Sequence, residues 1–105
     1  MAIHTVKTED KEYVLNFNSY AVMQAFRKYG AEGLATVTRN DLNFDMIKFG
    51  MSENGSVTVT DAEVYKFIDG IGGVFGEQFT GDLTNWVLEA FNIPTTESKK
   101  KEEAA

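Results

Sequence analysis

Residues 11–30 read KEYVLNFNSYAVMQAFRKYG, and within them the apolar residues change from strand-like to helical spacing. Residues 12–17 have the β-branched and aromatic composition of a short strand. Ser19 follows, and its hydroxyl can accept a hydrogen bond from an unpaired backbone amide, so we expect it to cap a helix. The stretch therefore predicts a strand that leads directly into a helix.

The helix after Ser19 is predicted to bury one stripe of its surface. Large apolar side chains recur there at helical spacing, namely Val22, Met23, Phe26 and Tyr29. Arg27 and Lys28 lie in its last turn, where cations suit the negative end of the helix dipole. Gly30 can adopt the left-handed backbone that often closes a helix. Residues 31–39 are less regular and predict either a short helical turn or a packed loop.

The residues before this stretch predict a β-hairpin. Residues 2–8 alternate in polarity, and Glu9-Asp10-Lys11 is a polar connection of hairpin length. A lone hairpin is only marginally stable, so it must pack on another part of the chain.

A second helix is expected to begin at a cap on Asn40 or Asp41 and to end at Gly50. Its inward-facing residues are expected to be Leu42, Met46 and Ile47, with Phe49 as a further candidate. Asn54-Gly55 is a strong turn signal. Residues 56–60 have β composition, but they are so few that they are either a very short strand or merely extended.

Two more helices are predicted downstream. Thr60-Asp61-Ala62-Glu63 is a capping box, which starts a helix. Its buried face is expected to comprise Val64, Phe67, Ile68 and Ile71. Residues 70–76 contain four glycines, which indicates a loop or a loosened helix end. The last helix is expected to start at Thr80 or Asp82 and to end before Pro94, which disfavours helical geometry at the residue before it.

These elements predict one α+β domain over residues 1–94, a short N-terminal β-hairpin followed by a bundle of about four helices. Its length of 105 residues suits a single domain. Residues 95–105 contain no large apolar side chain, so we expect a disordered charged tail.

The composition excludes several classes of function. Sixteen acidic against ten basic residues give a net charge of −6, which disfavours binding to nucleic acid or to an anionic membrane. No cysteine is present, so disulfides, thiolate catalysis and zinc–sulfur sites are excluded. Neither a signal peptide nor an apolar run of membrane-spanning length is recognisable, which predicts a cytoplasmic protein.

The sequence offers no constellation typical of an enzyme, so we expect no catalytic, cofactor or metal site. The single histidine, His4, is expected to be a surface residue of the first strand, and no nucleophile–histidine–acid triad can be built on it. The carboxylate pairs Asp41/Asp45 and Asp61/Glu63 are explained by helix capping and the helix dipole. The glycines of residues 70–76 follow a helix and lack a Gly-Lys-Ser/Thr sequence, so they do not form a phosphate loop.

Large apolar residues interleave with these glycines and are either core or a surface offered to a partner. We expect the partner-binding residues to be Val74, Phe75, Phe79 and Ile93.

The order of features resembles that of the tail assembly chaperones of long-tailed phages. Lys11-Glu-Tyr-Val-Leu-Asn-Phe-Asn18 and the helix ending Phe-Arg-Lys-Tyr-Gly30 match the hairpin and first helix typical of that family, and the likeness extends over about residues 5–93. Two features depart from it: Asp10 stands where the hairpin turn often has glycine, and residues 70–76 look like an insertion.

The resemblance implies a binding protein of the host cytoplasm. Such a chaperone keeps the long, hydrophobic tape measure protein in solution and leaves as tail tube proteins polymerise around it, with self-association in multiple copies along the client. Lys99-Lys100-Lys101 would suit a slippery codon run that yields a longer form. The alternative is another small phage or mobile-element interaction protein, either a virion component or an acidic inhibitor of a host enzyme.

Overall fold

The protein has an α+β fold, an N-terminal antiparallel hairpin followed by four α-helices, as the sequence predicts. The computed structural model describes residues 3–92. The hairpin comprises β1 (Ile3–Lys7) and β2 (Glu12–Asn16), paired with Thr5 opposite Val14. The helices are α1 (Ser19–Thr36), α2 (Arg39–Met51), α3 (Asp61–Gly70) and α4 (Thr84–Ala90), and a π-helical segment, η1 (Gln78–Leu83), leads into α4.

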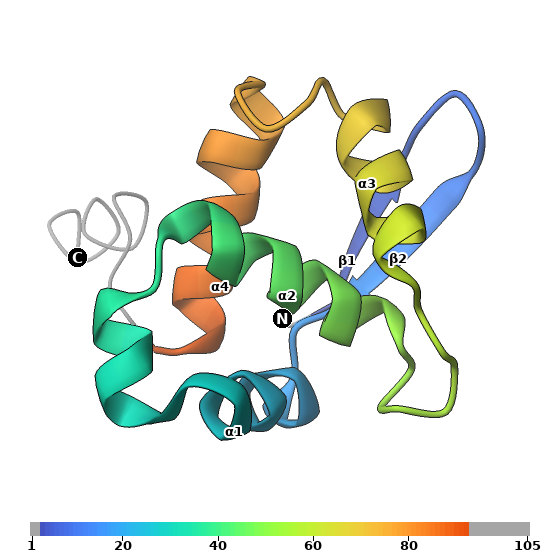
Figure 1. Cartoon of the computed structure of the whole chain (residues 1–105). Helices are drawn as coiled ribbons and strands as arrows, with labels where there is room; N and C mark the ends of the chain where they lie inside the picture. The colour runs from blue at the N-terminus through green and yellow to red at the C-terminus, as the bar shows by residue number, and fades with distance from the viewer. Residues whose placement is uncertain (1–2, 93–105) are drawn as a thin grey trace, which may run out of the picture.

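Helix α2 is the centre of the fold. It contacts β2, α1, α3 and α4, and Figure 1 shows it crossing the molecule with α1 below it and the hairpin and α3 to its right. The residues predicted to face inward from α2 are buried: Leu42, Met46 and Ile47. At its end, Gly50 lies against the ring of buried Phe17, so α2 and the end of β2 approach closely.

The inner face of the hairpin packs on the helices, with β2 against α2 and the ring of Tyr13 against α3. Val6, Tyr13 and Leu15 are buried, whereas Ile3 and Val14 point to the opposite, exposed face. The rings of Tyr13 and Phe67 meet edge to face with their centroids 4.9 Å apart. An isolated hairpin would be marginal, and this aromatic contact ties it to the helical layer.

The prediction for the buried face of α1 is right for Val22 and Tyr29, which pack against the core, and wrong for the other two residues of the predicted stripe. Ala21 and Ala25 are fully buried, whereas Met23 and Phe26 are about half exposed. The alanines, one turn apart, let α1 come close to its neighbours, and this places the larger side chains toward the outside. The N-cap is Asn18 rather than Ser19, because the Asn18 side chain accepts a hydrogen bond from the Ala21 amide at 3.2 Å.

Four local predictions have definite outcomes. Gly30 has a positive φ of 70°, and the chain then resumes a short helical turn that ends at Thr36. Helix α2 is capped by Thr38 rather than by Asn40 or Asp41. The Thr60 hydroxyl oxygen accepts a hydrogen bond of 3.2 Å from the Glu63 backbone amide, as the capping box predicts. Residues 56–60 form no strand in the described part of the chain: Ser56 belongs to a turn and Val57 to a bend, and residues 58–59 lead without regular structure to the extended cap residue Thr60.

The last helical segment starts earlier than predicted. Residues 78–83 form η1, so the helical path begins before Thr80 and Asp82. The predicted end of the domain at residue 94 and the predicted tail, residues 95–105, lie outside the described residues and stay predictions.

Candidate partner-binding surface

The loop between α3 and η1 is a hydrogen-bonded turn that carries two apolar residues, Val74 and Phe75, at its tip. The Gly73 amide donates to the Ile68 carbonyl at 2.9 Å, and the Gly76 amide donates to the Gly73 carbonyl at 3.0 Å. Gly73 has a φ of +84°, and a Cβ on Gly76 would lie 2.8 Å from the Gly72 carbonyl oxygen. The glycines are therefore required by the turn, which holds the residues between them outward.

Phe75 is the most exposed large apolar residue described. It is 91% exposed, and the preceding Val74 is 36% exposed. Both were predicted to contact a partner, and both are placed where they could do so.

The assignment of Phe79 to the same surface is wrong. Phe79 is only 1% exposed, because η1 turns its ring into the core. The fourth predicted contact residue, Ile93, lies outside the described residues.

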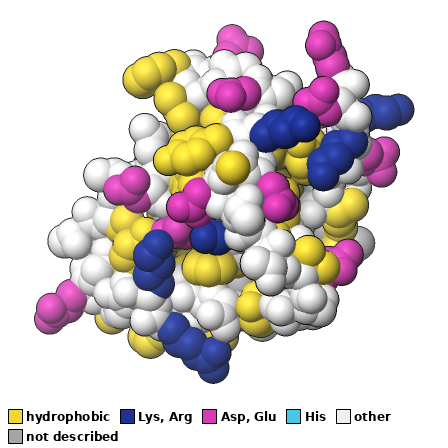
Figure 2. All heavy atoms as spheres, turned by 45° about the vertical axis from the view of Figure 1, so that its right-hand side comes forward, with side chains coloured by type: hydrophobic (Ala, Val, Ile, Leu, Met, Phe, Trp, Pro, Cys, Tyr) yellow, Lys and Arg dark blue, Asp and Glu magenta, His cyan; other side chains and the backbone are white. Residues whose placement is uncertain are grey.

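Val74 borders a hollow of about 560 Å³ that is also lined by Phe44 of α2 and Tyr65 of α3. The two rings lie 4.9 Å apart, centroid to centroid, and Tyr65 is 58% exposed. We call Phe44, Tyr65, Val74 and Phe75 the aromatic face. Figure 2 shows hydrophobic side chains interspersed with acidic and basic ones on the face of the molecule turned to the viewer.

A buried carboxylate lies beneath the aromatic face. Asp45 of α2 accepts hydrogen bonds from the Tyr29 hydroxyl and from the Lys28 ammonium group, the latter at 3.0 Å. Burial and, after it, the bond to Asp45 raise the pKa of Tyr29 far above its usual value, so its hydroxyl stays a donor. At the rim, the Lys48 ammonium lies 2.8 Å from the Asp61 carboxylate and links α2 to α3. The contacts of Asp45 thus join α2 to α1, and the exposed Lys48–Asp61 pair spans α2 and α3.

Phe44 and Tyr65 were not predicted from the sequence to belong to this surface. Each falls off the buried stripe of its own helix, beside Met46 and Ile47 in α2 and beside Val64 and Phe67 in α3. A large apolar residue off the stripe of an amphipathic helix is the signal that could have found them.

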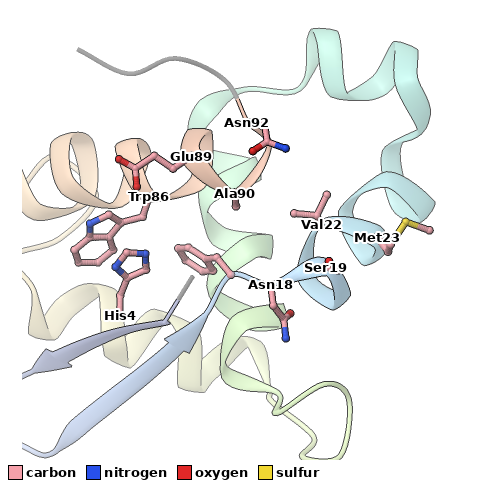
Figure 3. A pocket seen from close by; sticks show the side chains of 10 residues that line it. His4, Asn18, Ser19, Val22, Met23, Trp86, Glu89, Ala90 and Asn92 are labelled. Carbon is pink, nitrogen blue, oxygen red and sulfur yellow. The ribbon is translucent and has the colours of Figure 1, made fainter. Parts of the chain in front are cut away.

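A second hollow, of about 480 Å³, lies between β1, the start of α1 and α4 (Figure 3). Its distinctive feature is the stacking of His4 on Trp86, with ring centroids 4.3 Å apart and planes at 9°. His4 was predicted to be a surface residue, but it lies on the inner side of the hairpin and is partly buried. Burial lowers its pKa, against an opposing effect of Glu89.

Within residues 3–92, no three or more histidine, aspartate and glutamate side chains are grouped so as to hold a metal ion. Over the same residues, no helix has both the length and the apolar character needed to cross a membrane.

Comparison of the chain with protein-family models, curated proteins and solved structures found no match.

Proposed function

We propose that this protein is a non-catalytic binding protein, a phage tail assembly chaperone that holds the tape measure protein in solution and passes it to tail tube subunits. The observation that carries the proposal is the exposure of Phe75 on a turn built to present it. Aromatic side chains dominate the binding energy of protein interfaces, and contiguous exposed apolar patches mark interaction sites.

The aromatic face has the features that a chaperone of an apolar client needs. Phe44, Tyr65 and Val74 line the hollow, and Phe75 follows Val74 as an exposed ring at the tip of the loop. The rings come from α2, α3 and the loop, which share the core, so the surface is preorganised and loses little entropy on binding. The net charge of −6 keeps such a surface in solution before the client arrives. The resemblance of residues 5–93 to tail assembly chaperones supplies the identity of the client.

The proposal is tested by co-expressing the protein with the tape measure protein of the same genome and measuring the client in the soluble fraction. The wild-type chain should hold the client in solution and co-elute with it in size-exclusion chromatography. Phe75→Asp should weaken the complex by about tenfold or more, because truncation of an interface aromatic commonly costs about 2 kcal/mol.

Met23→Asp is the matched control. Met23 is an exposed apolar residue of α1 that borders the other hollow, so its loss should leave the client soluble. A client that stays insoluble with the wild-type chain would overturn the identity of the partner. A client held equally well by Phe75→Asp would overturn the aromatic face as its binding site.

A further inference from the structure

We propose that two copies of this chain associate through the outer edges of their β1 strands, forming a four-stranded antiparallel sheet in the order β2–β1–β1–β2. The occupant of this edge is thus a second copy. The inference does not depend on the proposed function, since it concerns the protein alone.

The direction of the backbone groups in the hairpin leaves this edge unpaired. The Thr8 amide donates to the Lys11 carbonyl at 2.9 Å, so these two residues form a hydrogen-bonded pair. Bonded and non-bonded pairs alternate in an antiparallel ladder, so Thr5 opposite Val14 is a non-bonded pair, as are Ile3 opposite Asn16 and Lys7 opposite Glu12. The amide and carbonyl groups of Ile3, Thr5 and Lys7 therefore point away from β2.

No described element covers that edge. Strand β2 is the only element against which β1 packs extensively, and no backbone hydrogen bond from another described element reaches Ile3, Thr5 or Lys7. Their side chains are all exposed, and Ile3 is 52% exposed. Unpaired strand edges are templates for another strand.

The other edge of the hairpin is obstructed. A Cβ on Gly50 would lie 3.3 Å from the amide nitrogen of Asn16, so the end of α2 lies against β2 there. Farther along β2, Met51 and Val57 form the opposite wall of a hollow of about 540 Å³. A strand approaching β2 would meet this wall. The described neighbours of β1, Trp86 against His4 and Gly70 against Thr8, contact side chains of its inner face instead.

The edge of β1 is complementary to itself. An antiparallel pairing centred on Thr5 places Thr5 opposite its own copy and Ile3 opposite Lys7 of the other chain. Each of these three pairs can exchange two backbone hydrogen bonds, and no two like charges face each other. This self-complementarity, which a two-fold interface requires, favours a second copy over an unrelated strand. The interface is small, so the dimer should be weak and form in a concentration-dependent manner.

Sedimentation velocity of the full chain at rising concentration tests the association. A reversible monomer–dimer equilibrium is expected below about 1 mM, since small interfaces give weak affinities. A chain that stays monomeric throughout that range would overturn the proposal.

Two charge variants of Ile3 test the register. Ile3→Glu should tighten the dimer about threefold to tenfold, because both symmetric copies of the introduced carboxylate face Lys7 of the other chain. Ile3→Lys should weaken it by a similar factor. General repulsion between two chains of charge −6 predicts instead that Ile3→Lys tightens the dimer and Ile3→Glu weakens it. That result would overturn the proposed register.

Two further variants complete the test. Val14→Lys is the matched control, because Val14 is 51% exposed on the same face but lies on the other strand, so the dimer should weaken less than in Ile3→Lys. Thr5→Pro removes a backbone amide that points away from β2, so no hydrogen bond within the hairpin is lost. The variant should therefore abolish the dimer, while its circular dichroism spectrum stays native. A dimer that survives Thr5→Pro would contradict pairing at this edge. Client solubilisation is a separate measurement, so failure of the dimer leaves the proposed function standing.

Discussion

The hydroxyl of Tyr29 donates a hydrogen bond to the buried carboxylate of Asp45 and so ties the end of the first straight segment of α1 to the middle of α2. Lys28, the neighbour of Tyr29, adds a charged donor to the same carboxylate. Because α2 also carries Phe44, this contact fixes the floor of the aromatic face relative to α1.

Asp45→Ala should lower the free energy of unfolding by about 2 kcal/mol, because it removes two hydrogen bonds to a buried charge, one of them from a lysine that is half in solvent. Urea denaturation measures the change. Asp41→Ala is the control, since Asp41 is exposed in the first turn of the same helix and its loss should cost about 0.5 kcal/mol. Equal effects of the two substitutions would contradict a structural role of the buried carboxylate.

The raised pKa of Tyr29 predicts a loss of stability in alkali. In the unfolded chain the hydroxyl ionises around pH 10, whereas in the folded protein it stays protonated to higher pH. The stabilisation is therefore complete below pH 10 and lost as the pH rises above it. Comparing the free energy of unfolding of wild type and Tyr29→Phe at pH 8 and pH 11 isolates this contribution from the other tyrosines. A parallel decline in the two proteins would refute it.

Gly50→Ala should destabilise the protein by about 1–3 kcal/mol even though alanine favours helices. The added Cβ would lie 2.8 Å from Cε1 of Phe17, a ring that the core does not allow to move aside. Gly81→Ala is the control, because no atom lies within 4 Å of the Cβ it would add, and thermal unfolding should show no loss of stability there. A Gly50→Ala protein as stable as wild type would show that α2 and β2 are less closely packed.

Phe75 and Phe79 should respond oppositely to the same truncation. Phe79→Ala should cost about 3–5 kcal/mol of unfolding free energy, since it empties part of the core. Phe75→Ala should change stability by less than about 0.5 kcal/mol, because the ring is almost wholly in solvent. Chemical denaturation of the two variants decides this, and a large loss of stability in Phe75→Ala would mean that the loop packs its ring.

Local signals in the sequence predict the elements of this fold well. The strand before Asn18, the capping box at Thr60 and the turn at Asn54-Gly55 each depend on neighbouring residues alone, and each is found as predicted. The buried face of α1 depends instead on how α1 docks on the rest of the chain. That docking selects Ala21 and Ala25 over Met23 and Phe26, which helical spacing alone could not reveal.

The candidate site could be predicted only in part, because some of its residues are placed by local signals and others by the packing of helices. The interleaved glycines indicate that residues 70–76 form a loop, and its apolar tip, Val74 and Phe75, follows from composition. Phe79 lies only four residues after Phe75, but the π-helical turn reverses its direction into the core. Phe44 and Tyr65 join the surface only through the packing of α2 on α3.

The most direct test of the account is site-specific photo-crosslinking in cells that co-express the tape measure protein. A photoreactive phenylalanine analogue replaces either Phe75, at the tip of the loop, or Phe26, which is exposed on α1. Both variants should remain folded, because both rings lie at the surface. The account predicts a crosslink to the client from position 75 that is much stronger than from position 26. A client crosslinked from position 26 but not from position 75 would contradict it.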